Sequence, residues 1–189
     1  MDFLTKCLSW VCGQAADRSW VFGDEMFPLC QRCTGIYAGA AIAAIIFCCT
    51  RRRPHRWTMM IHVLLVGQII PAGLHWCFDT PVLRTLSGGW FGIGLIGLMS
   101  RQIAVRFHSE SRTDSWGILT SFLAVTLLAS LTAYSNAAAA NLLAVLVVVG
   151  LFSIAVLIVA NVVQLYSLWR DEAPVVKTAC RHSAASKFF

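Results

Sequence analysis

Apolar residues dominate five stretches of the chain, and short polar segments separate these stretches from one another. A transmembrane helix needs about 20 predominantly apolar residues, and each stretch meets or approaches that length. The pattern therefore predicts an all-α fold, a polytopic membrane bundle of about five transmembrane helices. The predicted spans are residues 29–50 (with Thr34 as an alternative start), 57–78, 81–100, 116–134 and 141–168.

The segments between the spans carry charge and turn signals. Arg51–Arg53 follow the first span, and Asp79–Pro81 form a good helix-start signal before the third. The fifth span is longer than a bilayer requires, so we expect it to tilt or to emerge at the interface. The polar tail after it, residues 170–189, is expected to be loosely ordered.

Composition agrees with a membrane protein. Hydrophobic residues make up 58% and charged residues 13% of the 189 positions, whereas soluble domains are roughly half apolar and about a quarter charged. The mean hydropathy of +0.70 excludes a soluble globular domain and a disordered chain. The length leaves no room for a soluble catalytic domain beside the spans.

The positive charges are distributed unevenly and predict a topology. Eleven of the fifteen Lys and Arg residues lie in residues 51–56, in residues 101–112 and in the tail. Positive charge stays in the cytoplasm, so we expect the inner membrane, with the amino terminus outside and the carboxyl terminus cytoplasmic. Topology thereby accounts for the net charge of +6 without nucleic acid as a partner.

Residues 1–33 differ from the rest because they mix aromatic and charged side chains. They lack the positive start and long apolar core of a signal peptide. We expect residues 1–13 to form a short amphipathic helix at the interface and residues 18–29 to form a lid over the outer helix ends. The predicted organisation is a cysteine-containing outer-face lid over residues 1–33, a five-helix bundle over residues 34–168, and a cytoplasmic tail over residues 169–189.

The predicted topology places five of the eight cysteines toward the outer face of the membrane. The outer group is Cys7, Cys12, Cys30, Cys33 and Cys77, and the remaining three are Cys48, Cys49 and Cys180. We interpret the second group as small apolar fillers. The outer face is therefore where chemistry is expected.

Cys30 and Cys33 form a Cys-x-x-Cys motif at the start of the first span. Helical spacing puts both thiols on one face of the first turns, where the helix amino terminus stabilises a thiolate. The pair can bind zinc together with further ligands, cycle between dithiol and disulfide, or pack as inert thiols. Under the redox hypothesis, Cys30 and Cys33 are the catalytic residues and a quinone takes their electrons.

A zinc site needs further ligands. Cys12 is the best third candidate, and His75 or Cys77, at the outer end of the second span, supplies the fourth. Asp79 lies four residues from His75 and either orients the histidine ring or caps the next helix.

Three arginines form a second group near the same face. Arg84 lies one turn inside an apolar span, where a charge is costly and faces a partner. Together with Arg18 and Arg32 it can clamp the phosphate or carboxylate of an anionic headgroup or small anion. The alternative is that these arginines pair with nearby carboxylates, namely Asp17, Asp24, Glu25 and Asp79.

Small residues predict how two of the spans pack. Gly35-x-x-x-Gly39 and Gly88-x-x-x-Gly92 lie in the outer halves of the first and third spans. Such motifs let helices approach closely, so these two helices are expected to meet beneath the cysteines. His62 and Gln68 in the second span are expected to be satisfied polar groups inside the bundle.

The run from Phe27 to Gly39 reads Phe-Pro-Leu-Cys-Gln-Arg-Cys-Thr-Gly-Ile-Tyr-Ala-Gly. It resembles the Pro-Leu-Cys-x-Arg-Cys-Thr-Gly-Ile-Tyr-x-Gly signature of a family of small bacterial and archaeal membrane proteins, domain of unknown function 2085. Further matches extend the resemblance over roughly residues 12–92: Cys12, Arg18-Ser19, Pro71, Arg84 and Ser87-Gly88. Gly13 stands where the family has a histidine, and His75-Trp76 where it has Asp-Gly.

The resemblance implies no particular reaction, but it groups the outer cysteines with the three arginines. Because the family's histidine is missing, a metal site here would take its fourth ligand from His75 or Cys77. The leading hypothesis is an outer-face zinc site beside an arginine-lined pocket for an anionic lipid or small anion. The alternatives are a quinone-linked thiol–disulfide oxidoreductase, and a structural or assembly subunit or small transporter. Whether the protein is an enzyme stays open, and a homo-oligomer is compatible with each function.

Overall fold

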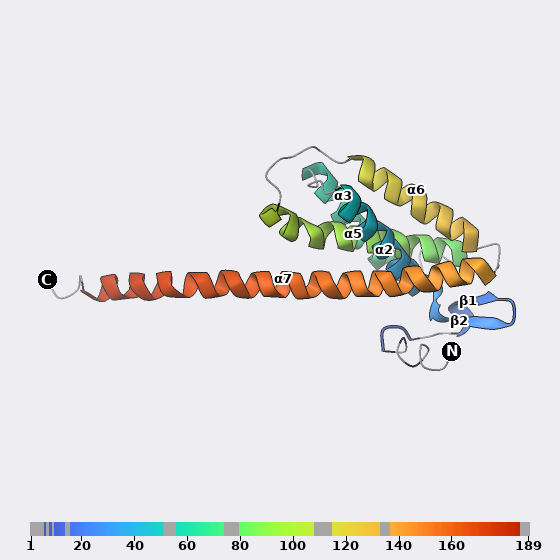
Figure 1. Ribbon diagram of the computed structural model, residues 1–189, viewed down its shortest axis with the longest axis horizontal. Helices are drawn as coiled ribbons and strands as arrows, with labels where there is room; N and C mark the ends of the chain where they lie inside the picture. The colour runs from blue at the N-terminus through green and yellow to red at the C-terminus, as the bar shows by residue number, and fades with distance from the viewer. Residues whose placement is uncertain are drawn as a thin grey trace.

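The computed structural model describes residues 6, 8, 10–13, 16–50, 56–73, 80–107, 115–132 and 137–185. A short 3-10 turn, η1 (Ala16–Arg18), leads into a β-hairpin and then into a helical bundle beside which the last helix runs (Figure 1). The elements after η1 are β1 (Ser19–Phe22), β2 (Glu25–Cys30), α2 (Gln31–Thr50), α3 (Arg56–Gly67), α4 (Ile69–Gly73), α5 (Pro81–Phe107), α6 (Ser115–Thr132) and α7 (Ala137–Ala185).

Helices occupy all five predicted spans. Three are long and apolar enough to cross a membrane by themselves, in the windows Gln31–Cys49, Pro81–Ser100 and Ala138–Ser167. The apolar parts of the other two, Thr58–Pro71 and Ile118–Ser130, are shorter. The predicted fold class, a helical membrane bundle, is thus confirmed, and three of the helices among the described residues have full spanning length.

Successive helices alternate in direction, as expected of a chain that crosses a membrane repeatedly. Gly35 faces Thr85 and Gly39 faces Gly89, so α2 and α5 run parallel. The His62 ring lies on Gly97, whereas Gln68 contacts Ser87, so α3 runs against α5. The long helix α7 runs parallel to both: Gly150 meets Tyr37 of α2, and Asn161 donates to the carbonyl of Met99, 3.3 Å away.

The closest packing in the bundle is between α2 and α5, where backbone meets backbone. A Cβ added to Gly35 would lie 2.0 Å from the Thr85 carbonyl oxygen, and one added to Gly88 would lie 2.1 Å from that of Arg32. Gly39 and Gly92 repeat the contact one turn further on, at 2.3 and 2.2 Å from carbonyl oxygens. Only glycine permits this approach, and the predicted pairing of the two motifs is confirmed.

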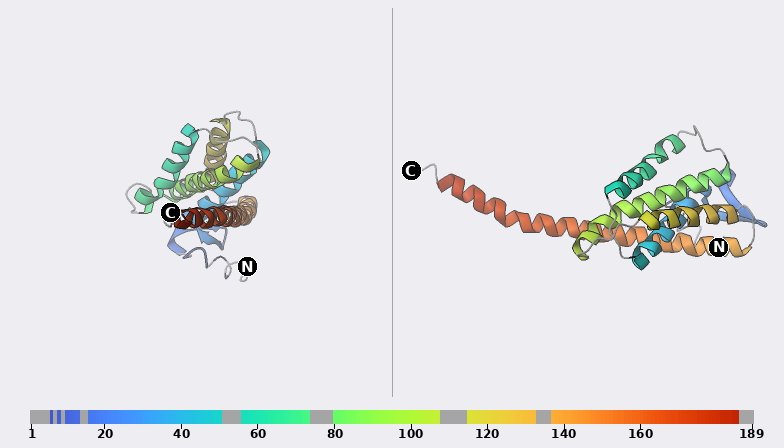
Figure 2. Two further views of the ribbon diagram at one scale, coloured as in Figure 1. Left: turned by 90° about the vertical axis from the view of Figure 1, so that its left-hand side faces the viewer. Right: turned by 90° about the horizontal axis from the view of Figure 1, so that it is seen from above.

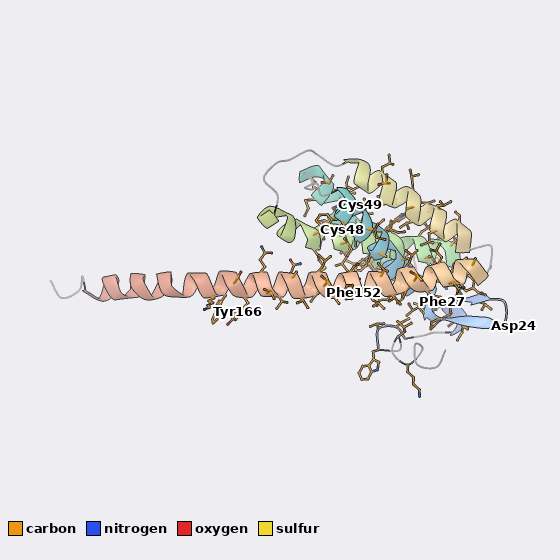
Figure 3. All side chains as sticks on the ribbon, viewed as in Figure 1. Asp24, Phe27, Cys48, Cys49, Phe152 and Tyr166 are labelled. Atoms are coloured by element: carbon orange, nitrogen blue, oxygen red, sulfur yellow. The ribbon has the colours of Figure 1, made fainter. Side chains whose placement is uncertain are left out.

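The buried core lies on both sides of this contact. One cluster, which includes Leu29, Ala38 and Leu143, sits beneath the hairpin. A second, which includes Ile93 and Val125, lies between α5 and its other neighbours. Large apolar side chains of α7 such as Phe152 are exposed (Figure 3), which is the surface that lipid covers in a bilayer.

The predicted lid is a β-hairpin rather than a helix or loop. Val21 pairs with Met26 and Phe22 with Glu25 in antiparallel register. The turn needs Gly23, whose φ of 65° lies in the left-handed region that glycine adopts at little cost. The hairpin is a minor addition to an otherwise helical fold.

The helices differ from the predicted spans at three places, although the apolar windows Pro81–Ser100 and Ala138–Ser167 agree with the predicted third and fifth spans. The second span is interrupted at Gln68, which separates α3 from α4 and donates its amide to the Ser87 carbonyl at 2.7 Å. The third span continues as α5 to Phe107, and α7 continues to Ala185 through the tail expected to be loosely ordered (Figure 2). Neither extension contains a glycine that would cap the helix end, and α7 continues past Pro174.

The two polar groups predicted to be satisfied in the second span are satisfied only in part. Gln68 donates its amide, but its buried Oε1 accepts no hydrogen bond from the described residues. His62 is 6% exposed, and its Nδ1 has no partner in the described part of the chain. The expectation is therefore half right for Gln68, and for His62 it does not hold at the Nδ1.

Replacing Gly35 with alanine is expected to destabilise the bundle by about 1–3 kcal/mol, the usual cost of overpacking. The added methyl group would collide with the Thr85 carbonyl, and backbone cannot move aside as a flexible side chain can. Reversible unfolding in detergent measures the change. Gly67→Ala is the matched control because an added Cβ meets nothing within 4 Å there; equal stability of the two variants would contradict the packing described.

Candidate metal centre

Cys30 forms the junction between β2 and α2 and acts as the amino-terminal cap of the helix. The Cys33 backbone N–H donates to the Cys30 Sγ at 3.5 Å, and the Thr34 hydroxyl donates to the Cys30 carbonyl at 3.0 Å. A side chain that accepts the third backbone N–H of a helix is the usual cap arrangement. The motif thus places Cys30 just before the helix and Cys33 in its first turn.

Cys12 reaches the same place from the amino-terminal segment. Its backbone N–H and that of Val11 both donate to the Leu8 carbonyl at 3.1 Å, which closes a short turn. Leu8 and Cys12 are 7% and 6% exposed and belong to the cluster beneath the hairpin. The Cys30 backbone N–H donates to the Cys12 Sγ at 3.4 Å, so Cys12 lies against the helix start.

The three sulfur atoms of Cys12, Cys30 and Cys33 all lie within 4.8 Å of one another, and all three thiols are free. Tetrahedral zinc with Zn–S bonds of about 2.3 Å separates its sulfur ligands by about 3.8 Å. Small side-chain rotations would therefore fit the cluster to an ion. This is the juxtaposition that the sequence predicted for three of its four ligands.

The surroundings favour the thiolate at Cys30. The hydrogen bond from the Cys33 thiol has the largest effect and, helped by backbone N–H groups and by Cys12, lowers the pKa of Cys30 to about 5 despite partial burial. The amino terminus of α2 acts in the same direction. Thiolate is the form that binds metal ions and attacks disulfides.

The predicted fourth ligands, His75 and Cys77, lie outside the described residues, as do Cys7 of the outer group and Asp79, predicted to orient His75 or to cap the next helix. The fourth position of a metal site therefore stays a prediction. Cys48 and Cys49 are exposed at the far end of α2 (Figure 3). They are apart from the cluster, as expected.

The three arginines differ in their surroundings. Arg18 is exposed and its Nε lies 3.3 Å from a carboxylate oxygen of Asp17, which is the pairing alternative considered for it. Arg32 and Arg84 are half-buried in the first turns of α2 and α5. These turns adjoin because Gly88, one turn after Arg84, packs on the Arg32 carbonyl. Arg32 and Arg84 thus lie together at the cysteine end of the bundle, and Arg18 directly precedes Ser19, which pairs with Cys30.

Two hydrogen bonds tie the hairpin across these helix starts. The Trp20 indole N–H donates to the Thr85 hydroxyl at 3.1 Å, and the Gln31 amide donates to the Ser19 carbonyl at 3.4 Å. Phe22 and Phe27 pack edge to face with centroids 6.0 Å apart. The hairpin is therefore fixed to both α2 and α5, over the same ends that carry the cysteines and arginines.

Tyr37 is a neighbour of the site that the sequence analysis did not single out. It follows Cys33 by four residues, hence on the same face of α2, and packs on the same cluster as Cys30 and Cys33. Its phenol interacts electrostatically with all three thiols. The four-residue spacing from Cys33 is the sequence feature that could have identified Tyr37 as a neighbour of the cysteines.

Residues 12–98 match the sequence model of the DUF2085 family, whose description is "predicted membrane protein". The match begins at Cys12 and ends within α5, so it contains the three clustered cysteines as well as Arg32 and Arg84. The resemblance seen in the Phe27–Gly39 motif is confirmed. No curated protein and no solved structure matches the chain.

The tie between the hairpin and α5 can be measured with a double-mutant cycle on Trp20→Phe and Thr85→Val. Each change removes one partner of the 3.1 Å hydrogen bond while preserving most of the side chain's volume. We expect a coupling free energy of about 0.5–1.5 kcal/mol in detergent unfolding, the usual net worth of one hydrogen bond. Strictly additive effects would show that the hairpin is not held by this bond.

Proposed function

We propose that this chain, whose residues 12–98 match the model of the DUF2085 family of predicted membrane proteins, holds a metal ion at one end of its membrane bundle. The proposed ion is zinc, and the proposed ligands are Cys12, Cys30 and Cys33. The observation that carries the proposal is the convergence of three free sulfur atoms within 4.8 Å from two separate segments, the amino-terminal turn and the β2–α2 junction.

The hydrogen bonds around the sulfur atoms support metal binding. Backbone N–H groups donate to the Sγ of Cys12 and of Cys30, and such donors orient and stabilise thiolate ligands. Three thiolates on a divalent ion leave a net negative charge, which the amino terminus of α2 offsets. Soft thiolates select zinc or copper(I) over hard cations. The fourth ligand is proposed to be His75 or Cys77.

A metal ion here would join the amino-terminal turn, the hairpin and α2. Cys12 belongs to the first of these, Cys30 ends β2, and Cys33 lies in α2. A structural zinc contributes directly to folding free energy, so the ion would order the lid. An ordered lid fixes the end of the bundle where Arg32 and Arg84 lie, and we propose that these two bind an anionic headgroup or small anion.

The uneven distribution of Lys and Arg supports an orientation for this site. Arg51–Arg53 follow α2, and more positive charge follows the spanning part of α5. These are the ends opposite the cysteines, because α2 and α5 run parallel. By the positive-inside rule the metal site would face the outside of the inner membrane.

A second candidate function is thiol–disulfide exchange at Cys30 and Cys33. It is favoured by the position of Cys30 as a helix cap whose sulfur accepts the Cys33 backbone N–H. In this reaction the two thiols lose two electrons and two protons as the S–S bond forms. A quinone would take up both electrons and both protons and become a quinol.

Full-length protein purified in detergent is expected to contain about one zinc ion per chain. Loss of a residue that only hydrogen-bonds to a metal ligand lowers metal affinity by roughly 10- to 100-fold. We expect a larger loss of zinc affinity in Cys12→Ser, Cys30→Ser and Cys33→Ser, because each variant lacks a thiolate ligand. Cys48→Ser, an exposed cysteine at the far end of α2, should keep full zinc content. Metal analysis and thiol titration on the same sample make the measurement.

Full metal content in both Cys30→Ser and Cys33→Ser would refute the metal proposal. Absence of metal, with two thiols titratable only after reduction, would select the redox candidate. Absence of metal with all thiols free would leave a structural role for the cluster.

Arg84→Ala is expected to reduce retention of phosphatidylglycerol several-fold, since it removes a half-buried cation beside Arg32. Arg18→Ala is the matched control, because Arg18 is exposed and paired with Asp17. Lipid co-purifying from mixed phosphatidylglycerol and phosphatidylcholine vesicles can be quantified by mass spectrometry. Unchanged phosphatidylglycerol in Arg84→Ala would rule out the headgroup site.

A further inference from the structure

The sulfur atoms of the candidate metal centre are also placed to form a disulfide. The Sγ atoms of Cys12, Cys30 and Cys33 lie within 4.8 Å of one another, and all three thiols are free. A sulfur atom that is bonded to a second sulfur is no longer a thiolate, and thiolate is the form that binds a metal ion. A metal ion and a disulfide therefore exclude each other at this site.

The three cysteines differ in their accessibility. Cys12 is 6% exposed and its sulfur accepts the Cys30 backbone N–H at 3.4 Å, whereas Cys30 and Cys33 are half-buried. A reagent from solution therefore reaches Cys30 or Cys33 before it reaches Cys12. These two residues also form the Cys-x-x-Cys motif at the start of α2, which is the arrangement that disulfide oxidoreductases use.

A metal ion would join two segments that a disulfide between Cys30 and Cys33 would leave apart. Cys12 belongs to the amino-terminal turn, which precedes the hairpin, while Cys30 and Cys33 lie at the β2–α2 junction. After oxidation of this pair, Cys12 would keep the hydrogen bond from the Cys30 backbone N–H and its apolar burial beside Leu8. It would lose the metal–sulfur bond, which is the strongest link between the turn and α2.

The hairpin is held by contacts that do not involve sulfur. Trp20 donates to the Thr85 hydroxyl at 3.1 Å, and Gln31 donates to the Ser19 carbonyl at 3.4 Å. Leu29 at the end of the hairpin is completely buried. Loss of the metal ion would therefore loosen the amino-terminal turn and leave the hairpin in place.

We propose that the three-cysteine site is a redox switch. A small disulfide compound from the outer side of the membrane oxidises Cys30 and Cys33 to a disulfide, which expels the metal ion and frees the amino-terminal turn. This inference rests on the metal site proposed above and adds the regulation of that site. Disulfides form and persist in oxidising compartments outside the cytoplasm, which is the side that the distribution of positive charge favours for the cysteines.

The reaction is a thiol–disulfide exchange in two steps. The Cys30 thiolate attacks the compound R–S–S–R, whose S–S bond breaks, so that Cys30 is joined to one R–S group and the other leaves as a thiolate. The Cys33 thiolate then attacks the Cys30 sulfur, and the second R–S group leaves as a thiolate. The two cysteines lose two electrons, which the two departing thiolates carry, and Zn²⁺ leaves because two of its ligands are gone. Cys12 is not oxidised.

The test uses full-length protein in detergent that has been reduced, freed of reductant and reloaded with zinc. Oxidised glutathione is added, released zinc is measured with a chromogenic chelator, and mass spectrometry after thiol alkylation locates the disulfide. We expect one zinc ion to be released for each disulfide formed between Cys30 and Cys33. Excess free zinc should slow the reaction at least about tenfold, because it refills the site that the disulfide must occupy.

Hydrogen exchange on the same samples separates the turn from the hairpin. The backbone N–H groups of Val11 and Cys12, which donate to the Leu8 carbonyl, should exchange at least about tenfold faster after oxidation, because the turn opens more often without the metal ion. Amides of the hairpin strands should keep their exchange rates.

Two variants give matched comparisons. Cys12→Ser should still form the disulfide between Cys30 and Cys33, but oxidation should not change exchange in the turn, because the turn is not tied to the metal in either state. Cys48→Ser, at the far end of α2, should release zinc and change its exchange as the wild type does.

Zinc that stays bound in excess oxidised glutathione would overturn the switch and leave the metal site standing. A disulfide from Cys12 to either of the other two cysteines, or unchanged exchange in the turn, would do the same. Failure of the reduced wild type to bind zinc would remove the metal site and the switch with it. If Cys12→Ser does not fold, zinc release and hydrogen exchange of the wild type decide.

Discussion

The contact between the α2 and α5 backbones is the constraint on which the rest of the structure depends. Four glycines let carbonyl oxygens of one helix occupy the space where side chains of the other would stand. Dispersion contacts of this kind hold helices together where lipid removes any hydrophobic gain from association. Because the contact is parallel and in fixed register, it places the two helix starts side by side, and with them Cys30, Cys33 and Arg84.

The chemistry at that end follows from how the chain enters α2. A strand that stops at Cys30 and a helix that begins at Gln31 leave free N–H groups that need acceptors. Here a sulfur atom accepts one of them, so the same atom caps the helix and is available to a metal ion. The hairpin completes the arrangement by bonding to both helices, which keeps Cys12, far away along the chain, against the helix start.

The sequence predicted the elements that depend on composition and local spacing. Apolar runs located the helices, small-residue spacing identified the α2–α5 contact, and the Cys-x-x-Cys motif with Cys12 identified the cluster. The features that it missed depend on tertiary contacts. The Trp20–Thr85 bond joins residues 65 apart, and the break at Gln68 is stabilised by the Ser87 carbonyl on another helix. The hairpin strands are too short for alternation to separate them from a loop.

The glycine contacts also divide the bundle into a frame and two attached helices. Where a backbone oxygen of one helix packs on a glycine of the other, no side chain is present that could change rotamer. The helices α2 and α5 therefore cannot slide or rotate past each other in small steps. The helix α7 belongs to the same frame, because its Gly150 packs on the Tyr37 carbonyl. By contrast, α6 meets α5 through side chains such as Val125 and Phe122. The helix α3 meets α5 mainly through the side chains of His62, Leu65 and Val66, with one looser backbone contact of the His62 carbonyl at Gly94. Packed helices shear along interfaces made of side chains. Any conformational cycle of the protein is therefore expected to move α3 and α6 against a rigid frame that keeps the cysteines fixed in place.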